Sequence, residues 1–108
     1  MELFNASGEQ INFNAVLDTG FTAYLTLSPA QVAQLGLVQV HTATVVLGDG
    51  SETSVPVYRG EIQWHNQRRL IYVHETDGGA LVGMSLLYGS LLTMRVIDGG
   101  GVTIEPLV

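Results

Sequence analysis

The chain has 108 residues, which suits one domain with a small core, and four basic against ten acidic residues give a net charge of −6. With this net charge the chain lacks the basic surface that nucleic-acid binding requires, and anionic membranes would repel the protein. The absence of cysteine excludes disulfides and thiolate metal sites, and no apolar run reaches the length of a membrane span. Residues 1–10 lack the basic start of a signal peptide, so the sequence indicates a soluble, cytoplasmic protein.

The first part of the chain predicts a turn and two strands. Residues 5–9 have turn composition, and residues 11–15 alternate apolar and polar side chains with the period of a half-buried strand. The alternation then gives way to apolar residues, which predicts that the strand enters the core just before Asp18. Residues 21–27 are rich in aromatic and β-prone side chains and predict a second strand.

One well-marked helix is predicted from Ser28 onward. Ser28 is a favourable N-cap, and Gln31 stands three residues later, as in a capping box. Leu27 and Val32 have the spacing of a hydrophobic staple, and Gly36 suits the C-terminal end. A helix of about two turns needs a sheet to pack against.

The remainder of the chain is rich in strand signals. Further strands are predicted at residues 41–47, 55–58, 61–64, 69–73, 80–83, 92–96 and 102–105. Pro56 restricts its strand to an edge or a bulge, and residues 84–88 predict a helical turn. Short strands at regular spacing indicate one all-β domain over residues 1–108, a closed barrel with one or two short helices.

Two short motifs carry the functional signal. Residues 18–21 read Asp-Thr-Gly-Phe directly after an apolar strand, and some tens of residues later a second apolar strand, residues 80–83, ends at Gly83 before a helical turn. In this order and spacing the motifs resemble those of the retropepsin-like (clan AA) aspartic proteases, and in particular the bacterial and archaeal branch with an Asp-Thr-Gly-Phe motif. The resemblance covers nearly the whole chain and implies a single-lobe β-barrel.

The resemblance also implies roles for individual residues. Asp18 would be the catalytic carboxylate, Thr19 would bond across a dimer axis, and the amide of Gly20 would bond the Asp18 carboxylate. The hairpin tip would be the substrate-covering flap, and the structural or dimer contacts would lie around the second motif. The implied substrate-binding residues are Phe21, Leu47, Gly48, Asp49, Gly50 and Val82, and the implied dimer or structural residues are Gly83, Met84 and Leu87.

The chemistry of peptide hydrolysis explains why a dimer is expected. Two carboxylates that share one proton can activate water and protonate the substrate, because like charges that close cannot both ionise. Asp49, Asp77 and Asp98 precede glycines in turn-like stretches, and none directly follows an apolar strand. The second carboxylate is therefore expected from Asp18 of a symmetry-related chain. The expected protein is a homodimeric aspartic endopeptidase that acts on extended peptides without a metal or cofactor.

Two features depart from the retroviral pattern. Retroviral members pair an Asp and an Arg to brace the dimer, and the corresponding positions here are Thr22 and Met84. Both partners are replaced together, so no buried charge is left unpaired. The dimer is then expected to depend on apolar contacts that involve Phe21, Met84 and Leu87, with residues 102–105 contributing.

Alternative interpretations remain open. Asp18 also fits a residue that caps its own turn, and residues 48–50 also fit an ordinary hairpin tip. His41, His65 and His74 lack metal-ligand spacing and are expected on strands or at the surface. The second functional hypothesis is a non-catalytic peptide-binding or dimerisation module that retains the protease fold.

Overall fold

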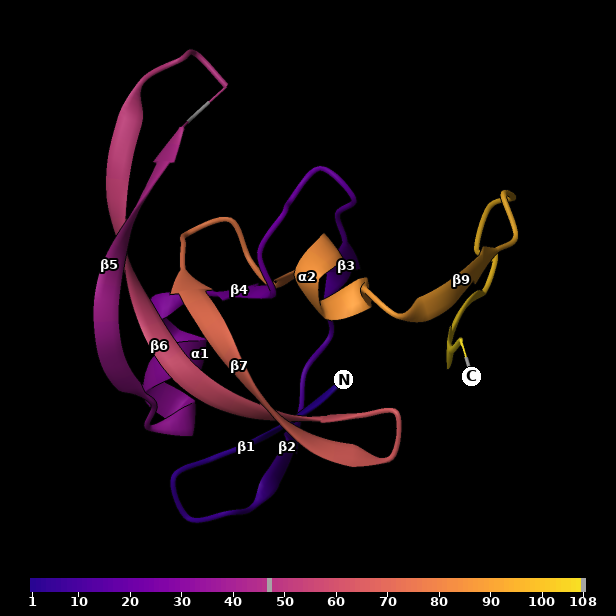
Figure 1. Ribbon diagram of the computed structural model, residues 1–108, viewed down its shortest axis with the longest axis horizontal. Coiled ribbons are helices and arrows are strands. Elements are labelled where there is room, and N and C mark those ends of the chain that lie inside the picture. Colours follow the sequence, from indigo (N-terminus) through magenta and orange to yellow (C-terminus); the bar gives the residue numbers. More distant parts are fainter. Residues whose placement is uncertain (47, 108) are drawn as a thin grey trace.

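The computed structural model describes residues 1–46 and 48–107. Strands dominate these residues, so the predicted all-β class is confirmed, and two short helices accompany them (Figure 1). The elements are β1 (Glu2–Phe4), β2 (Gln10–Asn12), β3 (Val16–Leu17), β4 (Leu25–Leu27), α1 (Pro29–Leu35), β5 (Val38–Val46), β6 (Glu52–Trp64), β7 (Gln67–Glu75), β8 (Leu81–Val82), α2 (Met84–Leu87), β9 (Ser90–Met94) and β10 (Val102–Pro106).

Eight of the strands form one curled sheet, a half-barrel. Its order is β2-β1-β6-β7-β4-β8-β3, and β5 pairs with β6 outside this path. Most pairs are antiparallel, but β3 runs parallel to β8 and β4 runs parallel to β7. Figure 1 shows β5 and β6 as a long, curved hairpin whose tip extends beyond the rest of the sheet. The parallel pair β3–β8 joins the two sequence motifs.

The predicted helix is confirmed with its caps. The amide of Gln31 donates to Ser28 Oγ at 3.2 Å, and the amide of Ser28 donates to Gln31 Oε1 at 2.9 Å, which completes a capping box. Gly36 ends α1 with a φ of 65°, in the left-handed region that favours glycine. Val32 and Leu35 are buried, so α1 packs one face against the core.

The hydrophobic core lies on the inner side of the curled sheet. Strands β1, β4, β6, β7 and β8 supply it, together with both helices and Phe13. Its fully buried side chains include Leu3, Leu25, Leu27, Leu35, Ile62, Ile71, Val73 and Leu86. Val57 is also fully buried but is not part of this cluster.

Two details of the early strands differ from the sequence prediction. The strand before Asp18 only borders the core, because Val16 is 65% exposed while Ala15 and Leu17 are half-buried and pack against the core cluster. Residues 21–24 are not part of a strand, and only Leu25–Leu27 pair in the sheet. Main-chain groups of residues 21–24 bond instead to the residues around Gly83. The apolar residues of these segments therefore belong to the surroundings of the Asp18 turn and do not mark longer strands.

The two later hairpins occur where they were predicted, but with different bounds. Residues 55–58 and 61–64, predicted as two strands, belong to the single strand β6, and the strand predicted at 92–96 is β9, Ser90–Met94. The turn between β6 and β7 uses His65 and Asn66, whose φ values of 51° and 61° match the twist of a tight hairpin. Pro56 lies where β6 pairs with β5 only, since the pairing with β7 begins at Val57. Strands β9 and β10 form a separate two-stranded sheet, which projects from the body and carries the C-terminus (Figure 1). Among the described residues, neither helix has the length and apolarity to cross a membrane.

Candidate active site

Asp18 stands at the end of β3, in a turn held by main-chain bonds. Its amide donates to the carbonyl oxygen of Val82 on β8 at 2.9 Å, and its own carbonyl accepts from the amide of Phe21 at 3.1 Å. The amide of Gly20 donates to Asp18 Oδ1 at 2.9 Å, the contact expected from the sequence. Asp18 is half-buried, whereas Thr19 and Gly20 are exposed. The carboxylate is thus oriented by its own turn and remains open to solvent.

Gly83 packs directly against this turn. A Cβ on Gly83 would lie 2.2 Å from the carbonyl oxygen of Ala23 and 2.8 Å from that of Phe21, distances that no side chain tolerates. The amide of Met84 donates to the same Phe21 carbonyl at 2.8 Å. The backbone of Gly83 is extended, a conformation that any residue can adopt. Glycine is therefore required here by the close packing and not by its backbone conformation.

Ser85 supplies a contact that sequence reasoning missed. Its hydroxyl donates to the carbonyl oxygen of Thr22 at 2.5 Å, and its amide donates to the carbonyl of Ala23 at 3.2 Å. These bonds join Thr22 and Ala23, in the segment after Asp18, to the first turn of α2. No sequence pattern singles out Ser85, because the bond uses a main-chain acceptor 63 residues away.

Thr26 is a second residue that the sequence did not reveal as part of the site. It is only 3% exposed, and its hydroxyl donates to the carbonyl of Gly79 at 2.8 Å and accepts from the amide of Leu81 at 2.9 Å. It thereby anchors the start of β8, which in turn positions Asp18. Its one sequence signal is a polar side chain between two leucines of β4.

His74 packs against the turn that contains Asp18 through Phe21. Its ring makes an edge contact with the ring of Phe21, with centroids 5.9 Å apart. Burial, followed by the nearby charge of His41, lowers the pKa of His74 below its usual 6.5. Its Nδ1 atom is buried and has no hydrogen-bond partner among the described residues. Neutral His74 is therefore the form that fits this packing.

The hairpin tip predicted as a flap is well formed. Gly48, Asp49 and Gly50 are all exposed, and Asp49 Oδ1 accepts from both the hydroxyl and the amide of Ser51, at 2.5 and 2.9 Å. These two bonds hold the pKa of Asp49 below its usual 3.8. Leu47 lies outside the described residues. No hydrogen bond joins the described part of the tip to the Asp18 turn.

The structure separates the remaining predicted residues by exposure. Val82 is 4% exposed and Leu87 is 5% exposed, and both belong to the hydrophobic core. Met84 is 43% exposed, whereas Phe21 is half-buried.

An apolar groove of about 730 Å³ lies between the body and the C-terminal hairpin. Leu17 and Val82, from the two strands that carry the motifs, line one side, and Met94, Val102 and Ile104 of the hairpin line the other. The indole Nε1 of Trp64, which also lines this groove, is buried without a partner among the described residues. The groove continues the apolar surface of the hairpin.

No cluster of three or more His, Asp or Glu side chains that could hold a metal ion occurs within residues 1–46 and 48–107. Asp49, Asp77 and Asp98 are all exposed and lie in three different connections between strands. The comparisons with family models, curated proteins and solved structures returned no match for this chain.

Proposed function

We propose that the chain is one subunit of a homodimeric aspartic endopeptidase with the single-lobe, retropepsin-like barrel fold. The observation that carries this proposal is the junction of the two motifs. The turn that contains Asp18 is hydrogen-bonded to Val82 and packs against Gly83 so closely that no side chain fits between them. Two motifs far apart in the chain thus form one unit that presents a single carboxylate.

The proposed chemistry needs two copies of Asp18. At a two-fold axis, the ionised carboxylate takes a proton from a water molecule, whose oxygen attacks the carbonyl carbon of the peptide bond. The protonated carboxylate gives its proton to the carbonyl oxygen. The C–N bond then breaks as the leaving nitrogen takes the proton from the first carboxylate and a hydroxyl of the tetrahedral diol gives its proton to the second, so the pair again holds one proton. An extended substrate would lie between the subunits, pair with the backbone of the flap and contact Phe21.

The C-terminal hairpin is the best candidate for the dimer contact. Its apolar side chains are largely exposed in the single chain: Val96 is 90% exposed, Ile97 71%, Met94 55% and Val102 49%. Exposed apolar surface of this kind marks interaction sites, and the adjoining groove offers a place to bury it. A partner's hairpin in this groove would pack directly behind the strand that leads to Asp18.

A subunit-mixing experiment tests the shared site. Wild-type and Asp18→Asn chains would be mixed in varied proportion, allowed to exchange, and assayed with an unstructured protein as substrate. If each site needs one Asp18 from each chain, activity follows the square of the wild-type fraction, so an equal mixture retains about a quarter of the activity. Activity that falls in simple proportion to the wild-type fraction would show that each chain acts alone.

The single variant gives a complementary test. Asp18→Asn should fold and dimerise as the wild type does and should not cleave, whereas residual cleavage would remove Asp18 from the mechanism. Wild-type activity should be highest on the acidic side of neutral, because one carboxylate of the pair must stay protonated. An activity plateau that extends above about pH 8 would contradict a shared proton.

A non-catalytic peptide-binding module is the second candidate function. The bond from the amide of Gly20 to Asp18 Oδ1 is equally compatible with it, because an aspartate that only caps its own turn accepts the same bond. A wild-type protein that binds peptides and never cleaves them across the acidic range would support this alternative.

A further inference from the structure

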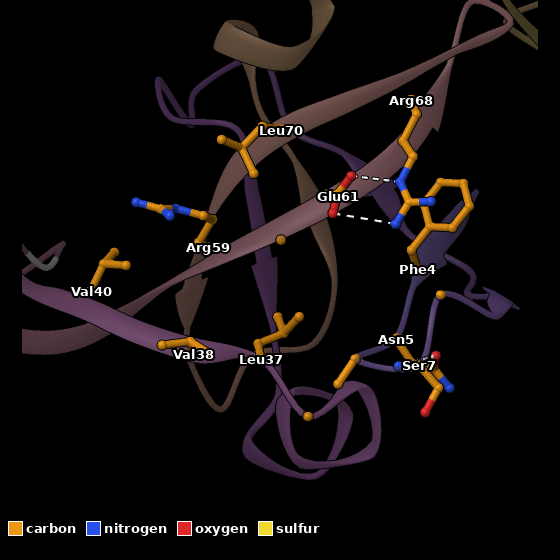
Figure 2. Close-up of a pocket in the computed structure, with 14 residues that line it drawn as sticks. Phe4, Asn5, Ser7, Leu37, Val38, Val40, Arg59, Glu61, Arg68 and Leu70 are labelled. Atoms are coloured by element: carbon orange, nitrogen blue, oxygen red, sulfur yellow. Dashed lines mark hydrogen bonds and ion pairs between the residues drawn. The ribbon is translucent and has the colours of Figure 1, made fainter.

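A second groove, of about 600 Å³, lies on the outer face of the sheet where β5, β6 and β7 run side by side (Figure 2). Gly60 of β6, Leu37 and the turn at residues 5–8 are among the residues that line it. It shares no lining residue with the apolar groove behind β3 and β8, and none comes from the Asp18 turn. Any ligand of this groove would therefore bind apart from the proposed active site.

The register of the strands arranges the outer face into rows. Arg59 of β6 stands directly opposite Val38 of β5 and Tyr72 of β7. In the next row, Glu61 stands between Phe4 and Leu70. Because directly paired residues project from the same face of a sheet, a polar line along β6 is flanked on both sides by apolar or aromatic side chains.

Most of the flanking side chains are open to solvent. Val38 is 71% exposed, Leu70 is 59% exposed and Tyr72 is 47% exposed, although all three belong to paired strands. Strand β5 pairs only with β6 within the described sheet, so the backbone of its other edge is free for a further strand. An exposed apolar strip beside a free edge is a surface that an extended segment can cover.

The charges of the groove are not balanced. Arg68 donates to both oxygens of Glu61, at 2.5 and 3.3 Å, and its guanidinium lies 4.0 Å from the centre of the Phe4 ring. This is the one ion pair formed within residues 1–46 and 48–107. Arg59 has uncharged neighbours on both adjacent strands, and Figure 2 shows its side chain directed away from the Glu61–Arg68 pair.

A free guanidinium is notable in a chain of ten acidic and four basic residues. Arginine binds carboxylates through two parallel hydrogen bonds, and it is enriched, with aromatic residues, where proteins bind one another. A nucleic acid or an anionic membrane is bound through many cations, whereas this groove offers one guanidinium that is not in an ion pair. A ligand with one carboxylate between apolar side chains therefore matches the single free guanidinium and the apolar side chains of this groove.

We propose that this groove is a docking site for an extended acidic peptide segment of a partner protein. An aspartate or glutamate side chain of the segment binds Arg59, and its apolar side chains cover Val38, Val40 and Leu70. The Glu61–Arg68 pair closes one end of the site and adds no net charge. If the chain is a protease as proposed, a substrate bound here would be held outside the catalytic cleft, but the docking site itself does not depend on that function.

The test measures binding of a defined peptide to the Asp18→Asn protein, which cannot consume it if the proposed mechanism holds. The probe is a fluorescent pentapeptide, Leu-Ser-Glu-Ser-Leu, capped at both ends, in which the carboxylate and both leucines project from the same side of an extended chain. Its matched control is Leu-Ser-Gln-Ser-Leu. Fluorescence anisotropy should show binding of the acidic peptide that is at least about tenfold tighter than that of the control. Amide shifts in an NMR titration should concentrate at Val38, Val40, Arg59 and Leu70.

Matched variants decide the assignment. Arg59→Gln should weaken binding of the acidic peptide by about tenfold or more, while Arg95→Gln, which removes the same charge from the exposed end of the C-terminal hairpin, should leave it unchanged. Equal affinity for the two peptides, or equal loss in both variants, would overturn the proposal. Self-association that Arg59→Gln abolishes would place a second copy in the groove and would also overturn it. Since all these readouts use the Asp18→Asn protein, a failed protease assay leaves them intact.

Discussion

The amide of Asp18 donates a hydrogen bond of 2.9 Å to the carbonyl oxygen of Val82 and so joins the two motifs of the chain. The bond extends the parallel pairing of β3 with β8, in which Leu17 stands opposite Val82. The direction of the Asp18 side chain is therefore set by β8 and by the residues that hold β8 in place. Changes near β8 should affect the site without touching the carboxylate.

Gly83→Ala should destabilise the protein strongly. The added methyl group would meet the carbonyl oxygens of Ala23 and Phe21, which are backbone atoms and cannot move aside. We expect a loss of about 1–3 kcal/mol or more in the free energy of unfolding, measured by urea denaturation. Gly78→Ala is the control, since nothing lies within 4 Å of its added carbon. Equal stability of the two variants would contradict the packing described for Gly83.

Thr26→Val should test the hydrogen bonds of the Thr26 hydroxyl without changing the volume of the side chain. The variant keeps the shape of the side chain but leaves the carbonyl of Gly79 and the amide of Leu81 without their partner. The expected cost is about 1–3 kcal/mol of unfolding free energy, because the site is buried. Thr53→Val, at an exposed position of β6, should change stability little. A Thr26 variant as stable as the wild type would mean that other groups hold β8.

His74 should make the stability of the protein depend on pH. Burial holds its folded-state pKa below 6.5, so below that pH the unfolded chain binds a proton more readily than the folded one. The contribution of His74 is complete above about pH 6.5 and is lost as the pH falls through the folded-state pKa. In urea titrations between about pH 7.5 and pH 5, His74→Gln should therefore lose less stability than the wild type.

The control for this titration is His65→Gln, a histidine in the turn between β6 and β7. It should retain the wild-type loss of stability on acidification. A His74→Gln protein with an unchanged pH profile would show that the burial of His74 does not oppose its protonation.

If the chain dimerises as proposed, Met94→Asp should abolish dimer formation while leaving the subunit folded. Met94 is 55% exposed and lines the groove between the hairpin and the body, so a charge there would oppose burial against a partner. Sedimentation equilibrium should show a monomer, and cleavage should be lost with the dimer. Val38→Asp introduces the same charge at a position that is 71% exposed on the outer face of the sheet, and the dimer should persist. Dimers of unchanged affinity in Met94→Asp would place the interface elsewhere.

Several elements were predictable because their signals are local. The caps of α1 depend on Ser28, Gln31 and Gly36, which lie within one short segment, and the structure has all three contacts. The long hairpin, the final hairpin and the turn at Asp18 follow from residue types that favour extended chain or tight turns. Residue composition alone also established the chain's low content of basic residues.

Long-range contacts were beyond this kind of prediction. The hydrogen bonds of the Thr26 hydroxyl and the bond from Ser85 to Thr22 join segments more than fifty residues apart. The exposure of Val16 depends on which other segments cover its strand. The same holds for the unpaired Arg59, whose neighbours are set by the register of three strands.

The sequence by itself determined the class of fold, the helix with its caps and the identity of the candidate carboxylate, because each rests on neighbouring residues or on composition. Only the tertiary structure decided which groups surround Asp18, which side chains remain exposed and where the outer groove lies. These features arise from pairing between strands that are distant in the sequence. Such strands meet through the register and curvature of the sheet, and both are set by the packing of the whole chain.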